Sequence, residues 1–119
     1  MGKIVLEKMQ FYAYHGCFKE EQLVGTTFEI TVSLTVDVSK PAVTDLLEDA
    51  VNYQEVYTLV KEQMAIPSKL LERVAQRILN RLLEQYPQIE QASIALSKLN
   101  PPLGGQIGRV TIEMSHNRG

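Results

Sequence analysis

An unbroken alternation over residues 28–38 constrains the fold of this chain more than any other feature. Every even-numbered position in that segment is apolar and every odd-numbered position is polar. Because successive side chains of a strand point to opposite faces, the pattern predicts a long strand with one buried and one wet face. The polar face must meet water, or line a wet channel if the sheet closes with copies of itself.

Three other segments have strand-like patterns. Residues 3–14 are rich in β-forming side chains, but their alternation is imperfect in the middle, which predicts a bent or bulged strand. Alternation returns over 92–98 and over 110–114, on either side of a turn rich in Pro and Gly. Residues 15–27 join the first two strands as a long connection, which we predict to be a functional loop.

Two consecutive helices are predicted in the middle of the chain. Apolar residues recur with helical spacing from Tyr53 to Met64, and this helix should end near Pro67. Ser68 is placed to N-cap a second helix, whose apolar stripe runs over 71–82. The element order is therefore ββααββ. We expect an α+β fold in which two helices pack on one face of a four-stranded, mainly antiparallel sheet.

Length and composition narrow the possibilities further. A chain of 119 residues with 45% hydrophobic and 22% charged residues predicts a single domain over 1–119. The net charge of -2, without a block of basic residues, argues against nucleic acid and anionic membranes as partners. No apolar run approaches the roughly 20 residues that cross a bilayer. The single cysteine, Cys17, excludes an intramolecular disulfide and fits a reducing compartment, so we expect a cytoplasmic protein.

Two kinds of ligand site are not favoured by the motifs. The glycines of 104–108 precede a strand, whereas a phosphate-binding loop opens a helix, so we interpret them as part of a turn. His15 and Cys17 lack the further ligands of a metal site, because the only other histidine is His116 in the C-terminal tail. No metal is therefore expected.

Two charged residues occupy positions that ask for an explanation. Glu72 lies beside the apolar stripe in the first turn of the second helix, where a carboxylate either complements the helix dipole or faces a cleft. Lys98 is in phase with Ile94 and Leu96, so it should point toward the helices. A lysine at such a position must extend to solvent or serve a site.

Five short segments follow one another along the chain: His15-Gly16, Glu21 with Gly25, Val51-Asn52-Tyr53, Leu70-Leu71-Glu72-Arg73-Val74-Ala75, and Lys98-x-Asn100-Pro101-Pro102. In this order they resemble the dihydroneopterin aldolase family, and the resemblance covers essentially the whole chain. The resemblance implies the tunnelling fold, in which four copies join their sheets into a ring. Two rings then stack into a homo-octamer, or stay apart as homotetramers, with active sites between subunits.

The reaction implied by the resemblance is a retro-aldol step in folate synthesis. It splits the pterin 7,8-dihydroneopterin into 6-hydroxymethyl-7,8-dihydropterin and glycolaldehyde. The C6=N5 imine of the pterin can accept the electrons that are released when the carbon–carbon bond breaks. The enzyme would therefore need no cofactor, no metal and no lysine Schiff base.

The resemblance also implies roles for particular residues. Glu72 would bind the N2 and N3 edge of the pterin, with backbone groups of Leu71 and of Val51 from a neighbouring subunit. Lys98 would act as acid and base near N5, and Tyr53 from the neighbour would handle the side-chain hydroxyl.

A carboxylate of the first loop completes the implied site. Glu21 would orient the lysine or the substrate's tail, and the adjacent Glu20 is the alternative carboxylate. The group that removes the first proton is left open.

Two other functions fit parts of the pattern. An epimerase on the same fold would act on dihydroneopterin or its triphosphate. A triphosphate calls for local basic residues, of which the first loop offers only Lys19. A non-catalytic pterin or purine binder would need Glu72 but would have no use for Lys98 and Tyr53. Analysis of the products formed from dihydroneopterin distinguishes all three functions.

Overall fold

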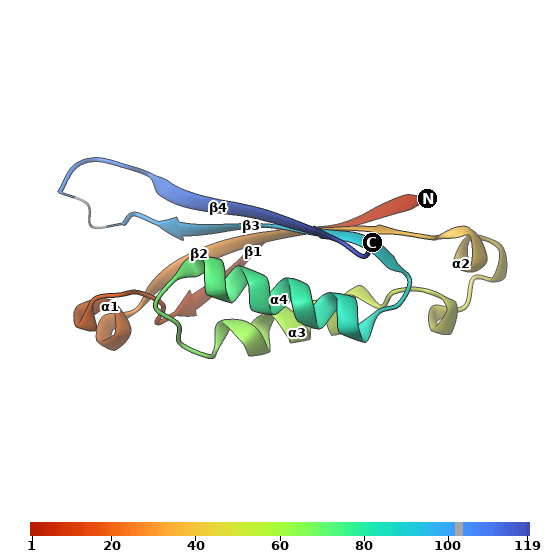
Figure 1. Cartoon of the computed structure of the whole chain (residues 1–119), viewed down its shortest axis with the longest axis horizontal. Coiled ribbons are helices and arrows are strands. Elements are labelled where there is room, and N and C mark those ends of the chain that lie inside the picture. Colours follow the sequence, from red (N-terminus) through yellow and green to blue (C-terminus); the bar gives the residue numbers. More distant parts are fainter. Residues whose placement is uncertain (102–103) are drawn as a thin grey trace.

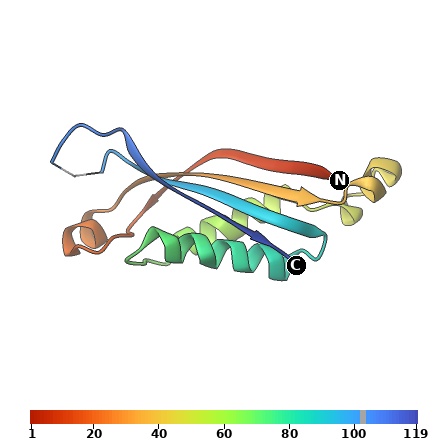
Figure 2. The same ribbon diagram turned by 45° about the horizontal axis from the view of Figure 1, so that its top comes forward.

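The computed structural model describes residues 1–101 and 104–119, so Pro102 of the last family segment lies outside the described residues. Four antiparallel strands form one sheet in the order β1-β2-β3-β4. Two long helices, α3 and α4, cover one face of this sheet (Figures 1 and 2). The predicted α+β fold is therefore confirmed. The strands are β1 (Gly2–Ala13), β2 (Thr26–Val36), β3 (Ile89–Leu99) and β4 (Arg109–Asn117), and the helices are α3 (Tyr53–Met64) and α4 (Leu71–Gln85).

Strand β2 is an inner strand of the sheet, and its alternation determines which face is buried. Its apolar side chains from Phe28 to Val36 are at most 1% exposed, whereas the polar residues between them are half-buried on the other face. The predicted irregularity of β1 is confirmed as a bulge between Leu6 and Met9. Lys8 adopts a positive φ of 55° there, and its N–H donates to Thr31 Oγ1 at 3.0 Å.

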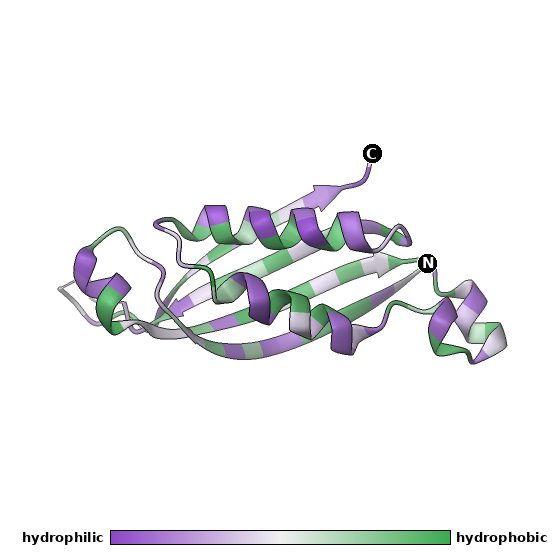
Figure 3. Ribbon diagram, turned by 90° about the horizontal axis from the view of Figure 1, so that it is seen from below, coloured by the Kyte–Doolittle hydropathy of each residue, from purple (hydrophilic) through white to green (hydrophobic). Residues whose placement is uncertain are grey.

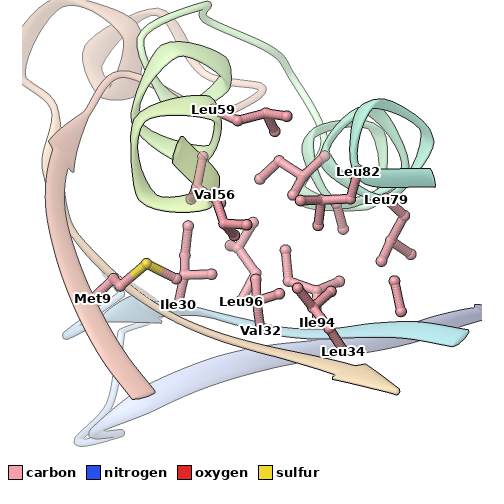
Figure 4. Packing of buried hydrophobic residues seen from close by; sticks show 14 of the residues in the cluster. Met9, Ile30, Val32, Leu34, Val56, Leu59, Leu79, Leu82, Ile94 and Leu96 are labelled. Atoms are coloured by element: carbon pink, nitrogen blue, oxygen red, sulfur yellow. The ribbon is translucent and has the colours of Figure 1, made fainter. Parts of the chain in front are cut away.

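The hydrophobic core lies between the sheet and the two helices. Figure 4 shows Ile30 and Val32 of β2 pointing toward the helices, where Val56 and Leu82 meet them. Seen from the helix side, α3 and α4 carry alternating hydrophilic and hydrophobic bands (Figure 3). Each fully buried aliphatic side chain contributes roughly 1.5–3 kcal/mol, so this layer dominates the stability of the fold.

Three short helical segments lie in connections that the sequence pattern did not assign to helices. They are α1 (Lys19–Val24), α2 (Ser39–Thr44) and the 3₁₀ helix η1 (Leu47–Asp49). None of their own residues is buried, so they lack the apolar stripe by which longer helices are recognised. The connection over 15–27, which we predict to be a functional loop, therefore contains a short helix over the six residues of α1.

Two smaller predictions are wrong. Leu70, not Ser68, occupies the N-cap position of α4. The Ser68 hydroxyl instead accepts a hydrogen bond from Arg77 at 2.6 Å. His116, which we placed in a C-terminal tail, lies in β4, where it pairs with Ala92 of β3.

The two long helices run in opposite directions along an elongated molecule of 53 × 25 × 23 Å. Figure 1 shows that α3 begins on its side toward α2, whereas α4 begins on its side toward α1. A 12-residue helix such as α3 is about 18 Å long. Residues at the N-termini of α3 and α4 are therefore far apart within one chain. In the described part of the chain, no helix is long and apolar enough to span a membrane.

Candidate active site

Lys98 lies near the end of β3, opposite Phe28 of β2, on the side of the sheet that faces the helices. This is the orientation that its alternation with Ile94 and Leu96 predicts. Its ammonium group forms an ion pair with the carboxylate of Glu21 from α1. The two side chains are only 13% and 17% exposed, so the pair is largely shielded from water.

Burial also affects the pKa of Lys98. Desolvation penalises the charged ammonium and lowers the pKa of Lys98 below its ordinary value, and the nearby Cys17 thiol partly offsets this shift. A lysine whose pKa moves toward neutrality can both give and take a proton. The Glu21 carboxylate fixes the position of that ammonium group beside the hollow described next.

A hollow of about 300 Å³ lies between α1, the start of α4 and the end of β3. Glu72 and Leu71, in the first turn of α4, line one side of it, and the Glu21–Lys98 pair lines another. Backbone N–H groups in the first turn of a helix have no partner within the helix, and the helix dipole favours an anion there. The remaining lining residues are Gly16, Cys17, Phe18, Lys69, Leu70, Pro101, Val110 and Ile112.

The same ion pair also borders a second hollow of about 320 Å³, which extends toward Gly25 and Asn100. Glu20 lines this second hollow, and Glu21 lines both. Of the two adjacent carboxylates, Glu21 is the one paired with Lys98.

Val51 and Tyr53 lie apart from Glu21, Lys98, Leu71 and Glu72. Tyr53 begins α3, with Asn52 as its N-cap, and its side chain is 67% exposed, whereas Val51 is buried in the core. The described residues that line the two hollows include neither of them. One chain therefore brings Glu21, Lys98, Leu71 and Glu72 together and leaves Val51 and Tyr53 at the far end of α3.

Several residues that border the first hollow were not predicted from the sequence. Cys17 and Phe18 contribute an exposed thiol and an exposed ring. Gly16 lies so close to Glu21 that an added Cβ would come within 2.6 Å of that side chain. No periodic pattern marks these residues, because they lie in an irregular segment whose path is set by tertiary contacts.

Comparison with known proteins identifies the family. Residues 4–115 match the family model described as FolB, dihydroneopterin aldolase. The chain belongs to the dihydroneopterin aldolase family. It is 41% identical to the dihydroneopterin aldolase of Streptococcus pyogenes serotype M6, over 99% of this chain and 100% of that protein. It is 35% identical to the enzyme of Bacillus subtilis strain 168, over 99% of each chain.

Solved structures show the same fold. An Escherichia coli dihydroneopterin aldolase in complex with neopterin superposes with a TM-score of 0.90 at 20% identity, over 98% of this chain and all of that one. A Burkholderia thailendensis dihydroneopterin aldolase bound to guanine gives 0.81 at 18% identity, over 99% of this chain and 92% of that one. The predicted family and its activity, that of a carbon–carbon lyase, are thus confirmed.

Proposed function

We propose that the hollow between α1, β3 and α4 is half of the aldolase active site, and that Tyr53 and Val51 of a neighbouring copy complete it. The observation that carries this proposal is the shielded Glu21–Lys98 pair, which borders the same hollow as the first turn of α4. Acid–base and anionic groups thus meet in a space that fits a bicyclic ring. Neopterin and guanine, the molecules bound in two solved relatives, are both such rings.

Glu72 supplies recognition in this proposal. The N2 amino group and the N3–H of a pterin form a flat pair of donors, which a carboxylate accepts with two parallel hydrogen bonds. Backbone groups of Leu71, at the start of α4, and of Val51 from the neighbour form further hydrogen bonds along the same edge of the pterin. The ring is then held with N5 directed toward Lys98.

The chemistry requires four proton movements. The 2'-hydroxyl of 7,8-dihydroneopterin loses its proton, the bond between C1' and C2' breaks, and glycolaldehyde leaves. The released electron pair enters the C6=N5 imine, N5 takes a proton, and C1' is protonated afterwards while N5 gives its proton back. Lys98 gives the proton to N5 and later takes it back, and Tyr53 of the neighbour transfers the protons at the side-chain hydroxyl and at C1'. In this scheme the substrate's own imine is the electron sink, so the protein needs neither a metal nor a covalent lysine adduct.

The edges of the sheet support the proposed assembly. Strands β1 and β4 are the two edges of the sheet, and an unpaired edge is available for pairing with another copy. Pairing β1 of one copy with β4 of the next closes a ring of four, with the polar face of β2 inside. Two such rings make the octamer.

The free, exposed Cys17 supports a reducing compartment, and we place the enzyme in the cytoplasm.

Incubation with 7,8-dihydroneopterin followed by chromatography tests the proposal. We expect 6-hydroxymethyl-7,8-dihydropterin and glycolaldehyde in equal amounts. Accumulation of the side-chain epimer alone would support an epimerase, and unchanged substrate would support a binding protein.

Light scattering should give a mass about eight times, or four times, that of the 13.4 kDa chain. A stable and fully active monomer would refute the shared site.

A further inference from the structure

Ser68 lies in the connection between α3 and α4, three residues before Leu71, and three polar groups of this residue bind other segments. Its N–H donates to His15 Nδ1 at 3.1 Å, and its carbonyl accepts from the Gly16 N–H at 2.9 Å. Its hydroxyl accepts from the Arg77 guanidinium at 2.6 Å. The segment that follows β1 and the middle of α4 are thereby both joined to one residue.

Arg77 ties the same connection to α3. Its guanidinium donates to the Gln63 side chain at 3.0 Å, to the Gln63 carbonyl at 2.9 Å and to the Ile66 carbonyl at 3.0 Å. All of its hydrogen-bond acceptors in the described part of the chain are neutral. Such a group fixes backbone geometry rather than balancing a charge.

His15 is the most deeply buried polar residue of this group, at 1% exposure, with its ring against Phe28 at a centroid distance of 5.3 Å. Burial, helped by the nearby charge of Arg77, lowers its pKa to about 4, so the imidazole is neutral at physiological pH. Because Nδ1 accepts the Ser68 N–H, the proton lies on Nε2, which has no hydrogen-bond partner among the described residues. Nδ1 is therefore the ring atom that joins His15 to Ser68.

The segment after His15 continues to the ion pair. Gly16 packs directly against the Glu21 side chain, and the Gly16 carbonyl accepts from the Gln22 side chain at 2.8 Å. The Phe18 N–H donates to Glu21 Oε1 at 3.4 Å, while Glu21 Oε2 pairs with Lys98. A continuous set of contacts therefore runs from Lys98 through Glu21 and Gly16 to Ser68, and from Ser68 along the backbone to Leu71 and Glu72.

We propose that His15, Ser68 and Arg77 are positioning residues, which set the spacing between the Glu21–Lys98 pair and the Leu71–Glu72 edge. This inference rests on the proposed function, in which the first half of the site moves protons and the second half binds the pterin. A ring that stays bound at Glu72 but lies about 1 Å from its correct place relative to Lys98 reacts up to about 100-fold more slowly. Loss of the network should therefore lower kcat more than it weakens pterin binding.

The test uses Arg77→Met, His15→Leu and Ser68→Ala, with His15→Asn as the conservative variant. The asparagine amide oxygen can accept the Ser68 N–H in place of Nδ1. Arg81→Met is the matched control, because Arg81 lies one turn further along α4 and pairs only with exposed Glu84 among the described residues. The wild-type enzyme is assayed first with 7,8-dihydroneopterin. Calorimetric titration with the pterin product then counts the binding sites of each variant, so that misfolded protein does not enter kcat.

We expect Arg77→Met and His15→Leu to lower kcat per binding site about tenfold or more, with the product Kd within about threefold of the wild type. Ser68→Ala removes one hydroxyl and should give a smaller drop. His15→Asn should restore most of the rate, and Arg81→Met should leave it unchanged. A kcat per site within twofold of the wild type in every folded variant would overturn the inference, however low the melting temperatures. A wild-type protein that binds the product but does not cleave the substrate would instead refute the proposed function.

Discussion

Replacing Lys98 by methionine removes a charge from the hollow while keeping nearly the same side-chain volume. The lysine is 13% exposed and faces one carboxylate, so few other groups can take over its protons. We expect kcat to fall about 10²- to 10⁴-fold, the usual range for one positioned acid or base, which is about 3–5 kcal/mol in the activation barrier. Binding of the pterin product should change much less, because in the proposed site Glu72 and backbone groups at the start of α4 hold the ring.

The effect of Lys98→Met on stability follows from where Glu21 lies. An ionised carboxylate left without its partner in a rigid core would cost about 3–5 kcal/mol. Glu21, however, is in α1, and none of the six residues of that helix is buried. The helix can therefore move the carboxylate into water, and we expect the free energy of unfolding to fall by only about 1 kcal/mol. Glu21→Gln combined with Lys98→Met should recover that loss without recovering kcat.

Steady-state product formation, followed by chromatography, measures kcat. Calorimetric titration with the pterin product measures its binding. Lys98→Arg should not restore turnover, because arginine keeps its proton near neutral pH. A Lys98→Met enzyme with the wild-type kcat would remove Lys98 from proton transfer. An adduct on Lys98 trapped by borohydride and found by mass spectrometry would replace proton transfer by Schiff-base chemistry.

Three further predictions concern recognition and stability. Glu72→Ala should weaken pterin product binding by about 2–5 kcal/mol in calorimetry, but should destabilise α4 by only about 0.5–1 kcal/mol; unchanged binding with lower stability would make Glu72 a helix cap. Because burial lowers the pKa of His15 from 6.5 to about 4, the unfolded chain binds more protons between these values, and the free energy of unfolding should fall as pH drops through this window, by up to about 3 kcal/mol. Denaturant melts from pH 4 to 7 measure this dependence. The slope of the free energy of unfolding against pH should correspond to about one proton fewer for His15→Asn than for the wild type. Equal slopes in the two proteins would contradict the prediction. Arg118 donates to the carbonyls of Leu83 and Tyr86 at the end of α4 and of Ile89 at the start of β3, so Arg118→Ala should lower the free energy of unfolding by about 1–2 kcal/mol in urea, whereas Arg81→Ala should change it by less than about 0.5 kcal/mol.

The long elements were predictable because each must bury one face. The strict alternation of β2 and the helical spacing of Val56, Val60, Ile78 and Leu82 reflect contact with a single core, and the structure buries these side chains completely. The short helix α1 makes no such contribution to the core. Its position depends instead on local contacts such as the Gly25 N–H that donates to the Glu21 carbonyl at 3.0 Å. Contacts of that kind leave no periodic pattern in the sequence.

Ser68 shows why a correct local rule can lead to a wrong assignment. Serine before an apolar stripe is a good N-cap, and the sequence pattern places it within two residues of the observed cap. In the folded chain its three polar groups bind His15, Gly16 and Arg77. Two of those partners come from a segment more than fifty positions away. Nothing in the local sequence therefore distinguishes a serine that caps a helix from one that binds distant segments.

Lys98 could be found from the sequence because its residue type conflicts with its phase on the strand. Glu72, by contrast, is also explained by the helix dipole, and only its position beside Lys98 around one hollow favours a role in binding. Tyr53 has neither signal: it is exposed at the start of a helix whose length separates it from Glu72 within the same chain. The proposed division of the site between copies requires assembly before catalysis. Weakening the contact between copies should therefore abolish turnover while the pterin-binding half of each chain stays intact.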